Sequence, residues 1–266
     1  MIAAIRSEWR KYLTTKLWWI LLIVVVCGAA LYAGLYGGLT AITVRATDSD
    51  ADVFTTPATL SAIYNGGNTL TRILALVLGV MAMGAEYRHK TLASTYLATP
   101  HRWVVLAAKT IVVALFGALY GIANAVAGIV VALPLVGWFG GGLSLGDGGV
   151  WRSLLLGVLS LALWALLGMG VGILIRNMVV ALLVAIAFAY MVEPLVSLIF
   201  AAKDWSVPLN LMPSGATSAL VGLENNPLMM APSNPFSWWL AGLVLLAWAA
   251  IPTVIGIVTT IGRDVE

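Results

Sequence analysis

Charged residues are scarce in this chain of 266 residues: Asp, Glu, Lys and Arg make up 9% of it, against about 25% in a soluble domain. Apolar residues make up 61%. This composition excludes an ordinary soluble domain and identifies a membrane protein. The length allows several spans of about 20 residues each but leaves little room for a separate soluble domain. We therefore expect a single transmembrane domain over residues 1–266.

Cysteine and histidine are rarer still, with one and two copies. Cys27 lies in the first apolar run and has no second cysteine with which to form an intramolecular disulfide. His89 and His101 share one charged loop, where no cysteine or acidic pair completes a metal site. G-x-S-x-G and H-E-x-x-H motifs are also missing. We therefore expect no catalytic residue, no metal and no cofactor in this chain.

The stretch GAEYRHKTLASTYLATPHRW, residues 84–103, holds much of the charge that is present. It approaches the phosphate-loop pattern G-x-x-x-x-G-K-[ST], but His89 stands where the second glycine is needed. An apolar helix precedes it, whereas a phosphate loop follows a strand. Nucleotide binding by this chain is therefore not expected.

Six apolar segments are long enough to cross a membrane, and they predict an all-α polytopic fold. The second is the weakest, because its uninterrupted apolar core runs only from Ile73 to Ala85; it must include residues 70–72 or begin upstream near Leu60. Pro134 is expected to bend the end of the third. The predicted spans are residues 18–42, 68–86, 103–137, 151–175, 178–201 and 237–262.

The distribution of Lys and Arg predicts the orientation. If the N-terminus is inside, the outer loops hold only Arg45, Arg152 and Lys203, with Arg72 just within the membrane. Most acidic residues then fall in the external loops: Asp48, Asp50, Asp52, Asp147, Asp204 and Glu224. Both termini are expected in the cytoplasm of a multi-pass plasma-membrane protein. Ten of the fourteen basic residues then face inward: Arg6, Arg10, Lys11, Lys16, Arg88, Lys90, Arg102, Lys109, Arg176 and Arg263.

Residues 1–17 have the pattern of a helix that lies in the membrane surface. The alternative is a frayed basic tail that serves only the positive-inside bias; neither resembles a nucleic-acid arm. At the other end of the chain, the external loop 202–235 carries five prolines and apolar patches, so part of it can dip back toward the membrane. In the N-terminal helix, Ile2, Ile5, Trp9 and Leu13 share one side, with Arg6, Arg10 and Lys11 largely opposite.

The cytoplasmic loop 88–102 can form a short helix. The second span ends near Glu86, Thr99-Pro100 enforces an extended exit, and KTLASTYLA between them places Leu92 and Tyr96 on one face. Such a helix is a docking surface. The alternative is a solvated loop that only carries positive-inside charge.

Three stretches carry a resemblance to a known family. GAEYRHKTLASTYLATPHRWVVLAAK from Gly84 resembles the cytoplasmic loop of type-2 exporter permeases of the ATP-binding cassette (ABC) superfamily, particularly the actinobacterial kind. VGILIRNMVVAL with MVEPLV, residues 171–182 and 191–196, resembles their junction of spans four and five. LMPSGATSALVG, residues 211–222, resembles their last external loop. Lys90 and His101 depart from the pattern, where glycine and arginine are more usual.

The resemblance implies a permease subunit with six helices, an interfacial N-terminal helix and a coupling helix between spans two and three. It implies export of an apolar or amphipathic substrate (drug, lipid or peptide) along spans two and five of a dimer with a second copy or paralogue. ATP and Mg would bind to separate cytoplasmic ABC ATPase subunits; membrane lipids are further partners, and nucleic acid is not. The implied coupling residues are Glu86, Tyr87, Arg88, His89, Lys90, Thr91, Leu92, Thr95, Tyr96, His101 and Arg102.

Two other classes remain open at this point. A non-transporting assembly or scaffold protein would have the same hydropathy but no reason for a coupling loop. An ion-coupled secondary transporter is expected to show inverted repeats and half-helices broken near the midplane, which the sequence does not indicate.

A few polar residues and glycines stand inside the apolar segments. Arg72 and Glu193 are expected at similar depth, so they form either an ion pair near an outer gate or reach separately toward the outer interface. Glycine pairs in the third and fourth spans allow helices to approach closely. We expect these contacts to form within one subunit, and the alternative is a contact between the two subunits of a dimer. Asn124 and Tyr120 are expected to bind neighbouring helices, and Asn177 to cap the fifth span. The glycine positions are Gly117, Gly121, Gly128, Gly168 and Gly172.

Overall fold

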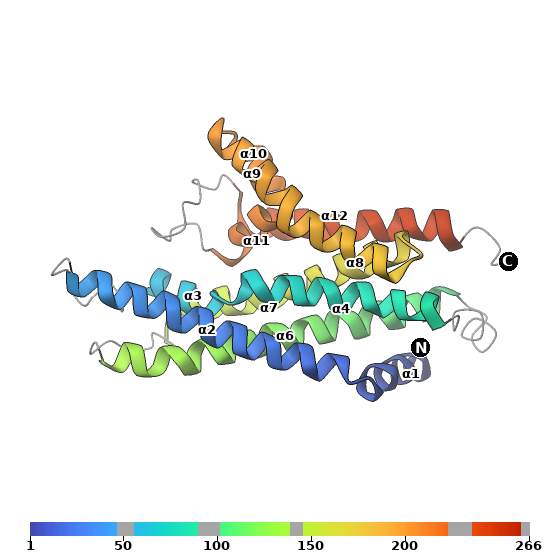
Figure 1. Ribbon diagram of the computed structural model, residues 1–266, viewed down its shortest axis with the longest axis horizontal. Helices are drawn as coiled ribbons and strands as arrows, with labels where there is room; N and C mark the ends of the chain where they lie inside the picture. The colour runs from blue at the N-terminus through green and yellow to red at the C-terminus, as the bar shows by residue number, and fades with distance from the viewer. Residues whose placement is uncertain (47–55, 90–101, 139–145, 223–235, 262–266) are drawn as a thin grey trace.

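The computed structural model describes residues 1–46, 56–89, 102–138, 146–222 and 236–261, in which no strand occurs. The helices follow one another from the N-terminal α1 to α12, with two π-helical segments, η2 and η3 (Figure 1). Their bounds are α1 Ile2–Thr14, α2 Leu17–Ala46, α3 Pro57–Asn65, α4 Asn68–His89, α6 Arg102–Trp138, α7 Gly148–Leu174, α8 Met178–Ala187, η2 Phe188–Val192, α9 Glu193–Ala202, α10 Ser206–Leu211, α11 Pro213–Val221, α12 Trp238–Gly256 and η3 Ile257–Ile261.

Six stretches of helix in the described residues are long and apolar enough to cross a membrane, which confirms the all-α, six-span prediction. The second one begins at Pro57 rather than Asn68, because α3 continues almost directly into α4. This matches the upstream alternative for that segment. The spans are Leu17–Thr43, Pro57–His89, Trp103–Trp138, Gly148–Leu174, Met178–Ala202 and Trp238–Thr259.

Helix α7 forms the centre of the bundle and packs against α4, α6, α11 and α12. Glycines make this close approach possible: a Cβ added to Gly168 would overlap the carbonyl oxygen of Leu76 on α4. A Cβ on Gly121 would lie 2.7 Å from the Cα of Val158 on α7. The glycine pairs therefore pack helices within this subunit, as the sequence predicted.

Polar side chains join the helices around the junction of α3 and α4. Asn65 on α3 donates to the Oγ of Ser153 on α7, which donates to the carbonyl of Val221 at the end of α11. The hydroxyl of Thr71 donates to Oδ1 of Asn124 at 2.9 Å, joining α4 to α6. Asn124 is thus satisfied by a neighbouring helix, as predicted.

Part of the segment 202–235 folds back onto the bundle. Helix α11 packs against α7 and α12, where Ala216 and Leu220 share an apolar cluster with Leu163 and Leu245. Helix α8 continues into α9 through the π-helical η2, which ends two residues before Pro194. Proline has no N–H to donate to the preceding turn, which accounts for the local change of helical geometry.

Helix α1, the last turn of α4, the first turn of α6 and the start of α8 lie at one end of the bundle (Figure 1). We call this the terminal end. The hydroxyl of Tyr120 donates to the carbonyl of Trp18 at 2.9 Å, which fixes the start of α2 against α6. Asn177 accepts hydrogen bonds from the backbone of Val179 and Val180, confirming its predicted role as the cap of α8.

Candidate functional site

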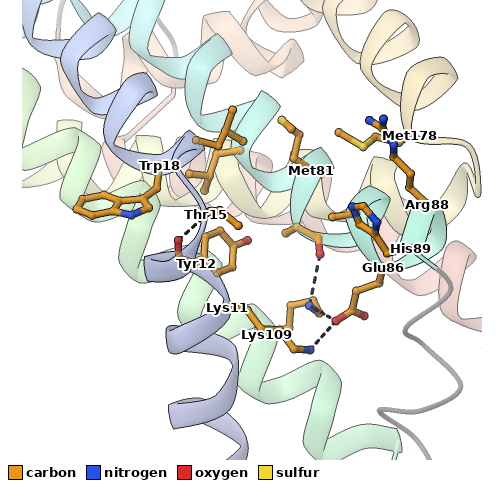
Figure 2. Close-up of a pocket in the computed structure, with 14 residues that line it drawn as sticks. Lys11, Tyr12, Thr15, Trp18, Met81, Glu86, Arg88, His89, Lys109 and Met178 are labelled. Atoms are coloured by element: carbon orange, nitrogen blue, oxygen red, sulfur yellow. Dashed lines mark hydrogen bonds and ion pairs between the residues drawn. The ribbon is translucent and has the colours of Figure 1, made fainter.

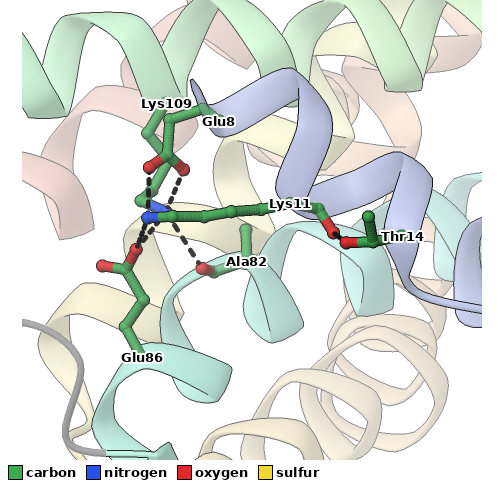
Figure 3. A network of polar contacts seen from close by, with 6 residues as sticks. All are labelled: Glu8, Lys11, Thr14, Ala82, Glu86 and Lys109. Atoms are coloured by element: carbon green, nitrogen blue, oxygen red, sulfur yellow. Dashed lines mark hydrogen bonds and ion pairs between the residues drawn. The ribbon is translucent and has the colours of Figure 1, made fainter. Parts of the chain in front are cut away.

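Four charged side chains meet at the terminal end: Glu8 and Lys11 from α1, Glu86 from α4 and Lys109 from α6 (Figure 3). Lys109 Nζ lies 2.6 Å from Glu8 Oε2 and 2.9 Å from Glu86 Oε1. Lys11 Nζ lies 2.5 Å from Glu8 Oε1 and 2.9 Å from the same Glu86 oxygen. We call these four residues the charge cluster; it joins three helices that are far apart in the sequence.

Three of the four side chains in the charge cluster are buried, whereas the Lys11 side chain is 42% exposed. Glu8, Glu86 and Lys109 are 3%, 6% and 2% exposed. Burying isolated charges costs several kcal/mol for each ion, so such groups persist only when they are paired and hydrogen-bonded. Here two carboxylates face two ammonium groups, and Lys109 also donates to the carbonyl of Ala82 at 3.4 Å. The cluster is therefore neutral as a unit.

Helix α1 packs against the bundle with the side that carries Glu8. Glu8 points inward, while Ile2 and Leu13 stay exposed. Lys11, on the side away from the apolar residues, is 42% exposed and pairs with Glu8 and Glu86. The sequence did not predict the pair with Glu86, because this partner lies on another helix.

Glu8 was missed by sequence reasoning, although two signals point to it. It is the only acidic residue before Asp48, within an otherwise basic helix. It also stands three residues before Lys11, a spacing at which side chains on a helix meet. Neither signal identifies Glu86 or Lys109 as partners.

Lys109 was counted among the inward basic residues of the positive-inside pattern. In the structure Lys109 belongs to α6 and is almost fully buried, and its ammonium group forms ion pairs with the carboxylates of Glu8 and Glu86. It therefore holds helices together and does not belong to a solvent-facing basic surface.

The environment of α1 shifts two of its pKa values. Burial of Lys11 acts to lower the pKa, but hydrogen bonds to Glu8 and Glu86 outweigh burial and the pKa is raised from its ordinary value. Lys11 therefore stays positive throughout the neutral range. Burial raises the pKa of the Tyr12 hydroxyl well above its ordinary value, so this group keeps its proton and remains a hydrogen-bond donor.

A pocket of about 470 Å³ adjoins the charge cluster, between α1 with the start of α2 on one side and α4 on the other. Tyr12 and Trp18 lie on one side of it and Arg88 and His89 on the opposite side (Figure 2). Such a volume is in the range of small-molecule sites. Its lining residues are Lys11, Tyr12, Thr15, Leu17, Trp18, Leu78, Met81, Ala82, Ala85, Glu86, Arg88, His89, Lys109 and Met178.

The predicted coupling residues are only partly within the described structure. Glu86 is buried in the charge cluster, so it does not present a docking surface of its own, contrary to the expectation. Tyr87 is half-buried and donates to the carbonyl of Ile173 at 3.4 Å. Arg88 and His89 are exposed. Lys90, Thr91, Leu92, Thr95, Tyr96 and His101 lie outside the described residues, and Arg102 begins α6.

Arg72 and Glu193 do not form an ion pair within 4.0 Å. Each has another partner: the Arg72 guanidinium lies 5.4 Å from the ring centroid of Trp164, and Glu193 Oε1 accepts from the backbone N–H of Ser214. Among the described residues, the ion pairs closer than 4.0 Å all belong to the charge cluster. Glu193 thus joins α9 to the start of α11.

In the described part of the chain, no group of three or more His, Cys, Asp or Glu side chains is placed to hold a metal ion. Residues 4–193 match the sequence profile of a family described as ABC-2 family transporter protein. This match covers more than half of the 266 residues. A search among curated proteins gives no match.

Proposed function

Because the chain belongs to the ABC-2 family of transporter proteins, we propose that this multi-pass permease is the membrane subunit of an ATP-driven exporter. ATP and Mg²⁺ are bound and hydrolysed by separate cytoplasmic ABC ATPase subunits, and the permease itself catalyses no reaction. The observation that carries the proposal is the charge cluster, which joins the two helices flanking the predicted coupling loop to each other and to α1.

The position of the loop supports this role. Helix α4 ends at His89 and α6 begins at Arg102, so the segment 90–101 joins two helices that Glu86 and Lys109 hold together one or two turns away. A partner that pushes on the segment would move the ends of α4 and α6 as one body. Glu8 and Lys11 would carry the movement to α1. A coupling mechanism needs this kind of contiguous contact between elements.

In this proposal the terminal end faces the cytoplasm. Arg88 and His89 are exposed next to the loop; Arg88 contributes charge to the ATPase interface and His89 contributes a hydrogen-bonding imidazole. Lys90, Thr91, Leu92, Thr95, Tyr96, His101 and Arg102 supply the remaining contacts, with Leu92 and Tyr96 as the apolar anchors. Glu86 and Tyr87 act from inside the subunit, because their side chains face the bundle.

The substrate proposed is apolar or amphipathic, and its path runs between two permease copies. The fifth span supports the dimer: large side chains such as Leu183, Tyr190, Leu195 and Leu198 are more than half exposed, so lipid or another copy covers them. The second span is the other proposed wall of the path. The partner copy is either this chain or a paralogue.

The test is the double substitution Leu92→Ala with Tyr96→Ala. We expect the variant to insert normally and to reach normal abundance, because orientation depends on Lys and Arg. Transport should fall and co-purification of the ATPase subunit should weaken, since the partner loses its apolar anchors. Leu31→Ala with Leu35→Ala, on an exposed part of α2, serves as the control. Normal transport with unchanged ATPase association in the first variant would overturn the assignment of residues 90–98 as a coupling helix.

A further inference from the structure

Helix α1 turns one side away from the bundle. Glu8 marks the side that packs against the other helices, where it meets Lys109 of α6. Arg6 and Arg10 stand nearly opposite Glu8 on a helix of 3.6 residues per turn, and both are exposed. We call the part of α1 around these two arginines its open side. An open groove of about 400 Å³ lies there, lined by Ala3, Arg6, Ser7, Arg10, Lys11 and Thr14.

The open side of α1 carries positive charge without a counter-charge. Arg6 and Arg10 are one helical turn apart, so their guanidinium groups repel each other. In the part of the chain that the structure describes, no carboxylate lies within 4.0 Å of either group. Lys11, the third cation at the groove, already pairs with Glu8 and Glu86. An anionic partner on the open side would therefore relieve the repulsion between the two arginines.

An apolar strip adjoins the two arginines. Ile2, Trp9 and Leu13 are exposed, and their helical positions place them between Arg6 and the side of α1 that packs on the bundle. The Trp9 ring marks the border of the strip, since it lies 5.0 Å from the ring of Phe116 on α6. A soluble anion would leave the strip in water. A lipid would cover both features, because its headgroup meets the basic residues and its chains meet the apolar ones.

The chain holds α1 at the boundary of the membrane. Thr15 and Lys16 alone separate α1 from the first span, which begins at Leu17. The backbone of Thr15 is extended, with φ −83° and ψ 144°, so α1 does not continue straight into α2. Trp19 is exposed near the start of the span, a position where tryptophan typically lies at the membrane–water interface. The open side of α1 is therefore close to the lipid headgroups.

We propose that the open side of α1 binds acidic phospholipids of the membrane. Their phosphates lie against Arg6 and Arg10, and the first part of their chains covers Ile2 and Leu13. This surface is distinct from the proposed ATPase interface, because it is turned away from α4 and α6, the helices that flank residues 90–101. The lipid fixes α1 in the membrane surface from one side, while the charge cluster joins it to the bundle from the other.

The test uses the full-length permease in phosphatidylcholine vesicles without an ATPase, so its outcome does not depend on the proposed transport function. A small fluorophore on Leu13→Cys in a Cys27→Ser background reports the lipid beside α1. Its quenching is compared for phosphatidylglycerol and phosphatidylcholine that carry the same nitroxide near the start of one acyl chain. The same label on Val254→Cys, an exposed position near the end of the sixth span, reports lipid elsewhere on the permease.

Phosphatidylglycerol should be enriched at the Leu13 label about 25-fold over phosphatidylcholine, since each basic residue at an anionic surface strengthens binding about fivefold. At the Val254 label the two lipids should quench almost equally. Arg6→Gln with Arg10→Gln should remove the preference at the Leu13 label. Arg6→Lys with Arg10→Lys should keep it, because lysine carries the same charge.

The matched control is Arg88→Gln with Arg176→Gln. It removes two exposed positive charges from the same end of the bundle but leaves α1 unchanged. We expect this variant to keep the preference for phosphatidylglycerol at the Leu13 label.

Four outcomes would overturn the proposal. Equal quenching by the two lipids at the Leu13 label would remove the acidic headgroup. Weaker quenching at Leu13 than at Val254 with both lipids would show that protein covers the open side. Equal losses in the two double glutamine variants would show diffuse attraction to a positive end of the bundle. Loss of the preference in the lysine variant as well would show that the two charges do not set it.

Discussion

Lys109 Nζ lies 2.6 Å from Glu8 Oε2, although the two residues are 101 positions apart in the sequence. Both side chains are almost fully buried. The pair joins the N-terminal helix to the third span, and Glu86 extends the link to the second. Removing one member of such a pair leaves an uncompensated charge in a place with little water, which makes the pair sensitive to single substitutions.

Glu8→Gln should lower the free energy of unfolding by about 3 kcal/mol, because it leaves Lys109 with only one anionic partner. Thermal unfolding in detergent measures the effect. Arg10→Gln is the control on the exposed side of α1. Glu8→Leu combined with Lys109→Met should cost less than the sum of the two single changes, since no unpaired charge remains from that pair. Equal melting temperatures for Glu8→Gln and Arg10→Gln would contradict the structural role of the cluster.

Gly168→Ala should separate α4 from α7 and destabilise the bundle by about 2 kcal/mol, within the range seen for overpacked cores. The added methyl group would overlap the backbone of Leu76, which cannot move as a side chain can. Gly38→Ala is the matched control: a Cβ there meets no atom within 4 Å. In that helix alanine should be neutral or stabilising by up to about 1 kcal/mol. A similar melting temperature for both variants would show that α4 and α7 do not pack as described.

Arg72→Gln and Glu193→Gln should be weakly coupled in a double-mutant cycle on transport, by about 0.5–1 kcal/mol. No ion pair within 4.0 Å joins the two charges, and glutamine can still accept from Ser214. Arg152 gives a matched control, since it also lies 5.4 Å from a tryptophan ring, that of Trp238. Arg152→Gln should be additive with Glu193→Gln. If the Arg72 cycle is also strictly additive, the pairing hypothesis is removed.

Single cysteines in a Cys27→Ser background should report the orientation. Cysteines at Asp50 and Asn226 should react with an impermeant thiol reagent added outside intact cells, while a cysteine at Thr95 should react only after the cells are opened. The positive-inside distribution of Lys and Arg gives this expectation. Labelling of the Thr95 position in intact cells would reverse the proposed topology. Weak labelling at Asn226 alone would be compatible with the fold-back of the preceding α11.

The spans, the cap of α8 and the close-packed glycines could be predicted from the sequence, because each depends on residues that are neighbours in the chain. Length and hydropathy are summed over neighbouring residues, so six helices follow from the sequence alone. The cap at Asn177 depends on the two or three residues after it, and the structure places its oxygen on the N–H groups of Val179 and Val180. The glycines of α6 and α7 predicted close helix packing. Glycine has no side chain, so it lets a neighbouring helix approach closely whichever helix that is.

Only the tertiary structure decided which charges meet. The pattern of α1 placed Lys11 on the side away from its apolar residues but indicated no partner for it. Glu86 stands 75 residues away and comes close only when α1 folds against α4 and α6. The same holds for the pocket, whose lining comes from α1, α2, α4, α6 and α8. Pairing across such distances depends on how the helices pack, and periodicity within one helix carries no information about it.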